Sequence, residues 1–362
     1  MERELPFSGH DLVHFSQHAS RCPALQIEDA LKFLHQSAFG CEHLVTDESA
    51  ARASIVREYG SFEDCGLPPV ELLDGEYCRV SLSWLEDGLS LDTLARIFFL
   101  SAKKEEGGRA RLLELLAELR TLTRQGVFPF DAEALDAALA RWETQNFGAL
   151  HHSDAFRAAY RPAYRVIARR FAEALPLFCE IDRRLKNGPL VVALEGGAAS
   201  GKTTLAGMFS EVYGASVIHM DDFFLRPSQR TRKRLEEVGG NVDYERFEDE
   251  VLAPLRRCET VRYRPFDCST TSFGKTVTVE PSRLVIIEGA YSMHPYFGDY
   301  AGLCVFLDVE KECQKERIER RNAEEVAARF FSEWIPKEDA YFERMKPKDR
   351  ADLIWSVKKN GR

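Results

Sequence analysis

The sequence lacks the features that mark membrane proteins and disulfide-stabilised scaffolds. No apolar run approaches the roughly 18 residues that a membrane-spanning helix needs. The polar, acidic segment Met1–His10 has no apolar stretch of the kind found in secretory signals. The nine cysteines form no C-x-x-C pair, which favours reduced thiols over a disulfide framework. We therefore expect a cytoplasmic protein that does not enter a membrane.

An excess of positive charge is also absent. The chain has 49 Lys and Arg against 58 Asp and Glu, a formal net charge of −9. Because binding to a phosphate backbone needs a positive surface, we expect no nucleic-acid partner. A content of 44% hydrophobic and 30% charged residues is typical of folded globular proteins and excludes wholesale disorder.

The pattern of apolar residues changes near Leu185–Pro189, and a length of 362 residues suits two domains. Before this point the apolar spacing is almost entirely helical, with one short strand-like run at Tyr77–Ser83. The expected helices are Ile27–Ser37, Ser90–Ala102, Arg109–Thr123, Asp131–Trp142 and Asp154–Leu175. The sequence therefore predicts a mostly α-helical domain over residues 1–186 and a second domain over residues 187–362.

From Pro189 onward, short apolar runs alternate with helical stretches. These runs are Leu190–Leu194, Ser216–Met220, Leu284–Ile287, Leu303–Leu307 and Leu353–Val357. Nearly continuous apolar runs are typical of parallel strands that are covered on both faces. The alternation predicts an α/β fold with a parallel sheet.

The most specific motif follows the first of these runs. It is a complete G-x-x-x-x-G-K-[ST] sequence, and a helical run over Thr204–Val212 comes after it. Its members are Gly196, Gly197, Ala198, Ala199, Ser200, Gly201, Lys202, Thr203 and Thr204. Glycines let backbone N–H groups converge on phosphate oxygens, and the helix N-terminus adds the positive end of its dipole. The motif predicts a P-loop NTPase fold that binds ATP.

Three side chains in and near this motif suit phosphate and magnesium. We expect Lys202 to reach the β- and γ-phosphates and the Thr203 hydroxyl to ligate Mg²⁺. The run Leu284–Ile287 ends in Glu288, as in the Walker B pattern, whose carboxylate holds Mg²⁺ directly or through water. The alternative is that Glu288 is an ordinary exposed carboxylate at a strand end. We favour the metal role, so ATP and Mg²⁺ are the expected cofactors.

Two carboxylates, Asp221 and Asp222, follow the run Ser216–Met220. Residues at the carboxyl end of such a strand lie where ligands bind in parallel sheets. One of the two could accept the proton of an attacking hydroxyl, as a kinase base does. The alternatives are an indirect magnesium contact or a helix cap, and spacing alone does not choose between them.

The helical run Lys311–Arg321 is basic and contains Arg317 and Arg320. Arginines here could close over a triphosphate and stabilise the charge that develops during transfer. Because acidic residues are interleaved with them, a solvated, salt-bridged surface helix is an equal alternative.

Together these segments resemble the uridine kinase-like branch of the P-loop kinases, whose relatives include nicotinamide riboside kinase, pantothenate kinase and phosphoribulokinase. The resemblance covers Pro189 to about Val357. It is carried by Gly196–Thr204, Val217–Phe224, Asn241–Tyr244, Tyr263–Asp267 and Ile287–Gly289, with Lys346–Pro347 and Ala351–Ile354 late in the chain. It implies a kinase that transfers the γ-phosphoryl group of ATP to a hydroxyl of a small, nucleoside-like molecule.

The resemblance also implies roles for individual residues. Asp221 matches the base that takes the proton of the accepting hydroxyl, and Arg317 and Arg320 match an Arg-x-x-Arg pair on the lid. A second lid pair of the family is missing, since Glu324–Ala327 stands in its place.

Four residues match the family's acceptor pocket. Asp243, with Tyr244 beside it, matches a carboxylate that holds sugar hydroxyls. Phe266 stands where uridine kinases place a tyrosine, next to Asp267. Thr271 falls at the position of a histidine of uridine kinases, so the resemblance does not extend to pyrimidine recognition.

The N-terminal half carries weaker signals. His10, His14 and His18 would share one face of a helix and could hold a metal, but no further ligands complete a site. The segment Phe33–His43 could line a pocket, although we favour core packing. A basic, aromatic helix over Phe156–Phe171 could contact nucleic acid or an acidic ligand, but we favour an amphipathic packing helix because the whole chain is acidic.

The alternative to a kinase is an ATP-binding regulatory protein in which the P-loop domain switches the helical domain. A regulator would not need the acceptor-pocket segments, so the kinase is favoured. The sequence makes no prediction of the acceptor's identity or of the oligomeric state.

Overall fold

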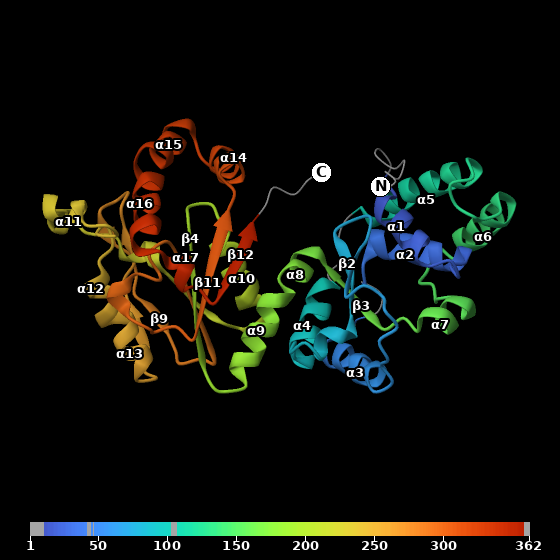
Figure 1. Ribbon diagram of the computed structural model, residues 1–362, viewed down its shortest axis with the longest axis horizontal. Helices are drawn as coiled ribbons and strands as arrows, with labels where there is room; N and C mark the ends of the chain where they lie inside the picture. The colour runs from blue at the N-terminus through green and yellow to red at the C-terminus, as the bar shows by residue number, and fades with distance from the viewer. Residues whose placement is uncertain (1–10, 42–44, 46, 103–106, 358–362) are drawn as a thin grey trace. The chain divides into compact units, whose positions relative to one another are not determined.

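The computed structural model describes residues 11–41, 45, 47–102 and 107–357 of the chain. The chain forms two compact units, Met1–Arg183 and Arg184–Arg362 (Figure 1). Within the described ranges, no helix combines the length and the apolar character that crossing a bilayer requires. His10 and the last two residues of the segment Phe33–His43 lie outside the described residues.

The N-terminal unit packs helices around a small antiparallel sheet of order β1-β2-β3. Its strands are β1 (Val70–Leu72), β2 (Tyr77–Ser81) and β3 (Tyr164–Ala168). Its helices are α1 (Val13–Arg21), α2 (Ile27–Phe39), α3 (Glu48–Tyr59), α4 (Leu91–Ser101), α5 (Gly108–Arg124), α6 (Ala132–Thr144), α7 (Asp154–Tyr160), α8 (Arg169–Glu173) and α9 (Leu175–Leu185), with a 3₁₀ turn at Leu82–Leu85. The first four expected helices are confirmed as α2, α4, α5 and α6. The expected strand is confirmed as β2, but it pairs with two strands that the sequence pattern did not indicate.

The expected helix over Asp154–Leu175 is wrong. Helix α7 ends before Arg161, which has a left-handed φ of 39°, and Pro162 follows without an N–H to donate. The chain then forms β3, which pairs along its length with β2. Val166 and Ile167, which fitted a helical spacing, are buried strand residues.

The arginines of this segment consequently do not share a helix face. Arg165 lies on β3, is 6% exposed and forms an ion pair with Glu58. Arg161 forms an ion pair with Glu63 on the surface. The continuous basic helix over Phe156–Phe171, which both interpretations of this segment assumed, is therefore wrong.

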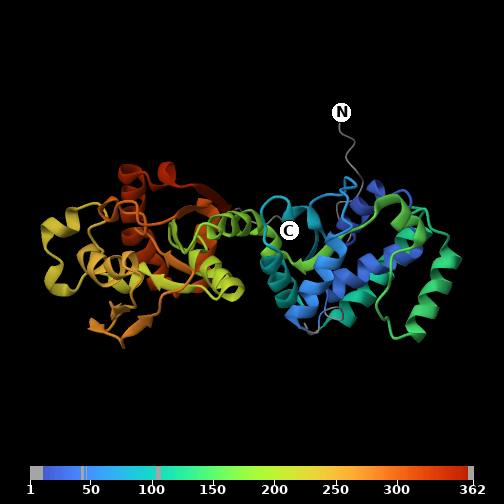
Figure 2. The same cartoon turned by 90° about the horizontal axis from the view of Figure 1, so that it is seen from below.

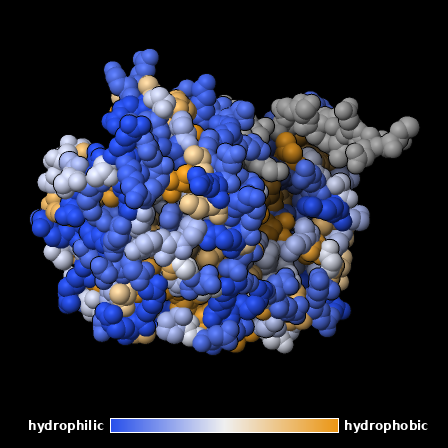
Figure 3. Space-filling view, turned by 60° about the vertical axis from the view of Figure 1, so that its left-hand side comes forward, coloured by the Kyte–Doolittle hydropathy of each residue, from blue (hydrophilic) through white to orange (hydrophobic). Residues whose placement is uncertain are grey.

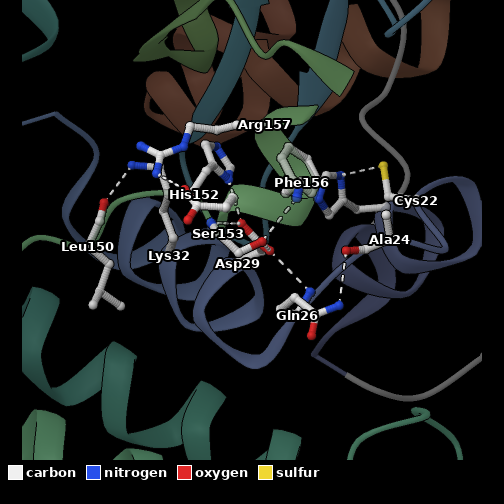
Figure 4. A network of polar contacts seen from close by, with 12 residues as sticks. Cys22, Ala24, Gln26, Asp29, Lys32, Leu150, His152, Ser153, Phe156 and Arg157 are labelled. Atoms are coloured by element: carbon white, nitrogen blue, oxygen red, sulfur yellow. Dashed lines mark hydrogen bonds and ion pairs between the residues drawn. The ribbon is translucent and has the colours of Figure 1, made fainter. Parts of the chain in front are cut away.

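A fully buried carboxylate joins α2 to the start of α7 (Figure 4). Asp29 accepts hydrogen bonds from the Ser153 hydroxyl at 2.6 Å and from His152 Nδ1 at 2.8 Å. The other ring nitrogen of His152 lies 2.6 Å from the Tyr164 hydroxyl on β3. Ser153 also caps α7 by accepting the Phe156 N–H at 3.1 Å. These bonds tie two helices and the sheet together.

We expect the N-terminal unit to lose stability as the pH falls from 6.5 towards 4. Burial lowers the pKa of His152 from 6.5 to about 4. In this window the unfolded chain binds a proton that the folded chain does not, so the free energy of unfolding falls with pH, by at most roughly 3 kcal/mol. Denaturant unfolding at several pH values measures how the free energy of unfolding changes with pH. This change should be smaller for His152→Gln than for the wild type. The exposed neighbour provides the control: His151→Gln should retain the wild-type slope, and an equal slope in both variants would contradict the assignment.

The C-terminal unit contains a parallel sheet and several short surface elements. The sheet strands are β4 (Leu190–Gly196), β5 (Ser216–His219), β10 (Leu284–Glu288), β11 (Leu303–Val309) and β12 (Leu353–Val357). The main helices are α10 (Lys202–Tyr213), α14 (Lys311–Arg321), α15 (Glu324–Arg329) and α16 (Ile335–Met345), with short α11 (Arg232–Glu236), α12 (Tyr244–Phe247), α13 (Ala253–Arg256) and α17 (Pro347–Arg350). The minor strands are β6 (Val261–Tyr263), β7 (Phe266–Asp267), β8 (Ser272–Phe273) and β9 (Val277–Val279). The 3₁₀ turns are η3 (Met220–Phe223), η4 (Pro227–Gln229) and η6 (Pro295–Phe297), and η5 (Glu248–Leu252) and η7 (Phe330–Trp334) are short π-helices.

All five expected strands are confirmed, and they form one sheet of order β12-β11-β4-β10-β5 with parallel pairing throughout. The predicted fold class, a P-loop α/β unit after a mostly helical unit, is thereby confirmed. The register places Glu288 of β10 beside Leu194 of β4 and His219 of β5, and Leu307 of β11 beside Gly196. The carboxyl ends of four strands therefore meet at one edge of the sheet.

Helices cover both faces of this sheet (Figures 1 and 2). Helix α10 packs on β4, β5 and β10. Alternate residues of β10, Val285 and Ile287, join Phe247 and Tyr341 in a core on the other face. The surface shown in Figure 3 is mostly hydrophilic, with hydrophobic residues scattered over it, as is usual for folded domains.

Candidate active site

The glycine-rich motif forms the turn between β4 and α10. Gly196 has a φ of 149°, and a Cβ there would lie 2.6 Å from the carbonyl oxygen of Leu307, so only glycine fits. Gly201 has a φ of 100° and precedes the first turn of α10. The loop backbone thus ends at a helix N-terminus, which favours a bound phosphate.

Lys202 stands on the first turn of α10 and folds back over the loop. Its ammonium donates hydrogen bonds to the carbonyl oxygens of Gly196 at 2.9 Å and Gly197 at 2.8 Å. The positive charge is thereby held at the loop, where the sequence predicts the phosphates.

Thr203 and Glu288 meet at the end of the sheet, and a histidine joins them. The Thr203 hydroxyl donates to Glu288 Oε1 at 3.1 Å, and His219 Nδ1 lies 2.6 Å from the same oxygen. Burial alone would raise the pKa of Glu288, but the hydrogen bond from His219 and the charge of Lys202 outweigh it and lower the pKa. His219 was not predicted as a site residue, although it lies inside a motif that carries the resemblance.

This pair of oxygen groups fits a magnesium ion bound together with a nucleotide. Mg²⁺ takes oxygen ligands and is usually held by one or two protein groups, with waters and substrate phosphates completing its shell. The Thr203 hydroxyl and the ionised Glu288 carboxylate provide two such ligands next to the phosphate loop. Among the described residues, no cluster of three or more His, Cys, Asp or Glu side chains forms an independent metal site.

The two aspartates of η3 lie in different surroundings. Asp222 accepts a hydrogen bond from the Tyr263 hydroxyl at 3.0 Å. Asp221 is exposed, yet the protein packed around its carboxylate raises its pKa; the charge of Glu288 adds to this, and that of Lys202 opposes it. Asp221 is therefore the carboxylate that can face a ligand between the phosphate loop and the end of β10.

The structure gives Asp243 and Tyr244 structural contacts. Asp243 is 2% exposed and caps α12, accepting the Arg246 N–H at 3.3 Å and a Gln229 side-chain N–H at 2.9 Å. The Tyr244 hydroxyl donates to Glu237 at 2.9 Å. Each carboxylate oxygen of Asp243 thus accepts one hydrogen bond from a neighbouring residue.

Phe266 and Asp267 form strand β7, which pairs with β8 in a β-hairpin. Phe266 is 4% exposed and packs edge-on against Phe273 with ring centroids 5.5 Å apart. The exposed Asp267 accepts the Ser269 N–H at 2.7 Å and the Thr270 hydroxyl at 3.0 Å, which closes the turn. Strand β7 contacts η3, so this hairpin lies beside the Asp221 segment.

The basic helix α14 contacts the phosphate loop through one of its two predicted arginines. Arg317 Nη1 donates to the Ala199 carbonyl oxygen at 3.1 Å, whereas Arg320 is exposed on the helix surface. Gln314, on the same helix, donates to the Ala198 carbonyl oxygen at 2.8 Å. Gln314 was missed because a single glutamine in a charged helix carries no sequence signal.

A carboxylate from α16 accepts a hydrogen bond from an N–H group of the phosphate loop. Glu338 Oε2 accepts the Ala198 N–H at 2.8 Å, and the side chain is largely buried. Burial raises the pKa of Glu338, and the charge of Asp221 adds to the shift. A negative group thus sits where the loop would bind an anion, a feature that sequence reasoning missed entirely.

A second carboxylate, Glu195, lies at the start of the phosphate loop and holds it by hydrogen bonds. It is 0% exposed and accepts hydrogen bonds from the N–H groups of Gly196, Tyr291 and Met293 and from the Tyr341 hydroxyl. Burial raises the pKa of Glu195 to about 7. The contact fixes the start of the loop against the segment after β10 and against α16.

Comparison with known proteins agrees with this geometry, although no protein-family model matches the chain. A uridine kinase from Ligilactobacillus salivarius (strain UCC118) is 25% identical over 148 residues, covering 39% of this chain and 70% of the relative. One from Limosilactobacillus reuteri (strain DSM 20016) is 25% identical over 184 residues, covering 46% of this chain and 82% of the relative. The P-loop unit is similar in sequence to uridine kinases. The resemblance stated from the motifs is thereby confirmed for about half of the chain.

Among solved structures, a possible uridine kinase from Bacillus stearothermophilus aligns over 50% of this chain and 99% of its own length. Its identity is 23% and its TM-score 0.38, so the alignment adds nothing to the sequence similarity.

Proposed function

We propose that the C-terminal unit is an ATP-dependent kinase that transfers the γ-phosphoryl group to a hydroxyl of a small, nucleoside-like molecule. The observation that supports this best is the convergence at one sheet edge of Lys202 on the loop, the Thr203–Glu288 pair and the exposed Asp221. Phosphorylation of a hydroxyl needs positive charge that stabilises the phosphates and a separate carboxylate that acts as the base.

Each part has a role in the transfer. Lys202 and Arg317 neutralise charge on the phosphates as the bond to the leaving group breaks. Thr203 and Glu288 would hold Mg²⁺, which supplies further charge neutralisation at the phosphates when bound. Asp221 orients the acceptor hydroxyl and takes its proton as the oxygen attacks the γ-phosphorus.

The test is ADP release with ATP and Mg²⁺ across a panel of hydroxyl compounds. The panel contains uridine, cytidine, other nucleosides, nicotinamide riboside, pantothenate and glycerate. Release stimulated by one compound, together with its phosphorylated product in the mass spectrum, would support the proposal and identify the acceptor. ATP binding without stimulated release by any compound would count against it.

One observation favours the second candidate, an ATP-binding regulatory protein. Asp243 and Phe266, which the family resemblance assigns to the acceptor pocket, are buried in structural contacts. A protein that binds ATP as a switch needs no open acceptor pocket. The same assay separates the two, since a regulator binds ATP but shows no acceptor-stimulated release.

Glu338→Gln should tighten ATP binding, with Kd falling roughly tenfold. The glutamine has nearly the same shape and keeps an oxygen for the Ala198 N–H, but it removes a negative charge beside the site proposed for the triphosphate. Titration of the full-length protein with ATP by calorimetry measures the change.

Asp339→Asn is the matched control for this prediction, because it removes the charge of the next residue along α16. Asp339 pairs with Lys311 on the surface, with the ammonium 2.7 Å from Oδ1. The control should leave Kd unchanged. Equal or weaker ATP binding in Glu338→Gln would show that the carboxylate does not oppose the nucleotide.

A further inference from the structure

A cavity in the N-terminal unit has no assigned role. Its inner wall is formed by His18 of α1, Glu71 of β1, Arg79 of β2, Tyr164 of β3, and Phe156 and Tyr160 of α7. The segment from Phe62 to Pro68 forms its mouth. The cavity has a volume of about 470 Å³ when the open space at its mouth is included, and about 30 Å³ of this can hold a water-sized group, which is room for about one water or hydroxyl group.

One buried atom on the wall of this cavity is a hydrogen-bond acceptor without a donor. His18 is 1% exposed, and its Nδ1 lies 2.8 Å from Glu71 Oε1. Burial lowers the pKa of His18, so the neutral ring carries its proton on Nδ1 and donates it to the carboxylate. The lone pair of Nε2 is left, and Nε2 has no partner among the described residues.

A second buried atom is a donor without an acceptor. Arg79 is 3% exposed; its Nε donates to Gln36 at 2.8 Å and its Nη1 to Glu71 at 3.1 Å. Its Nη2 has no partner in the described part of the chain. The guanidinium is held in place by Phe33 and Tyr164, each with its ring centroid 4.8 Å away.

The surrounding network is otherwise hydrogen-bonded. Glu71 uses both oxygens, since Arg21 donates to Oε1 at 2.9 Å in addition to the bonds from His18 and Arg79. Tyr164 lies against His152, which is bonded in turn to Asp29. The two unpaired atoms of this network therefore belong to two residues of the cavity wall, His18 and Arg79. Leaving such groups unpaired is unfavourable, so they indicate a place for a ligand.

We propose that this cavity binds a small hydroxylated ring compound, such as a cyclic polyol or a nucleoside. Its hydroxyl donates to His18 Nε2 and accepts from Arg79 Nη2, a combination that one hydroxyl group supplies. The ring rests against the aromatic side chains of Phe156 and Tyr160 and the apolar side chain of Leu67 at the mouth. An anionic group fits less well, because it would need His18 to be protonated, which burial and the nearby Arg79 disfavour.

The experiment is saturation-transfer NMR on the full-length protein with ribose, uridine, myo-inositol and phenol as probes. Leu67→Trp fills the mouth from a half-buried loop position and leaves the buried network intact. Leu113→Trp adds the same ring at an exposed position of α5 and serves as the control. We expect at least one probe to bind wild type and Leu113→Trp but not Leu67→Trp. Binding by no probe, or equal binding by all three proteins, would overturn the proposal.

Arg79→Lys provides a second measurement, made after its folding has been checked by thermal unfolding. It keeps the positive charge but removes Nη2, so the probe that binds should lose roughly tenfold in affinity. Unchanged affinity would overturn the proposal, as would a crystal structure grown with that probe in which only a water bridges His18 and Arg79. Leu67→Trp should retain the kinase turnover of wild type, which separates this cavity from an acceptor bound at the phosphate loop.

Discussion

Asp221→Asn should lower the turnover of the proposed kinase by roughly 10²–10⁴-fold while the Kd for ATP stays nearly unchanged. The asparagine keeps the size of the side chain and can still hold a hydroxyl, but it cannot take the proton. Asp221 lies on η3, outside the phosphate loop, so we expect ATP binding to depend on it little. The measurement is acceptor-stimulated ADP release together with a calorimetric ATP titration.

The neighbouring aspartate supplies the control. Asp222 is engaged by the Tyr263 hydroxyl at 3.0 Å, so Asp222→Asn should disturb local packing and reduce turnover far less. If Asp221→Asn retained wild-type turnover, Asp221 would not be the base. An equal loss in both variants would mean that the segment as a whole, rather than one carboxylate, is needed.

Lys202→Ala should reduce kcat/KM by roughly 10²–10³-fold through weaker ATP binding, slower transfer or both. The ammonium is the fixed positive charge of the loop and also bonds the carbonyl oxygens of Gly196 and Gly197. Its removal takes away the charge at the phosphates and loosens the turn that shapes the site. Steady-state kinetics and ATP titration measure the two contributions separately.

Lys348→Ala tests whether loss of any lysine has this effect. Lys348 lies on α17 and pairs with Asp308, with the ammonium 2.6 Å from the carboxylate, on the surface of the same unit. This variant should keep wild-type kinetics. Wild-type kinetics in Lys202→Ala itself would overturn the interpretation of the phosphate loop.

Much of the P-loop unit could be predicted because its signals are local. The strand, the turn and the helix of the loop are contiguous in sequence, and each apolar run is long enough to identify a buried strand. The N-terminal sheet could not be predicted in the same way. β1 is three residues long, and β3 follows α7 without a change in apolar spacing; only Arg161 and Pro162 mark the break.

In the candidate site, too, the residues with a local sequence motif were predicted more reliably than the others. Lys202, Thr203 and Glu288 were found from motifs, and the structure places Lys202 on the loop and joins Thr203 to Glu288 by a hydrogen bond. Asp243 and Phe266 were assigned through family resemblance, but the structure shows them capping a helix and packing a hairpin. A motif predicts which residues lie near a site. The side-chain rotamers and neighbouring residues decide which of their atoms can contact a ligand.

The sequence by itself determined the α/β fold of the second unit and the position of its phosphate loop, because both depend on residues that are adjacent in the chain. Only the tertiary structure decided what surrounds that loop. Glu338 bonds Ala198 across 140 residues, and Tyr341 bonds Glu195 across 146. The cavity between His18 and Arg79 likewise depends on a helix and a sheet that meet only in the folded unit. Such contacts leave no local pattern, because any helix presents many polar side chains and packing alone selects the one that reaches a buried partner.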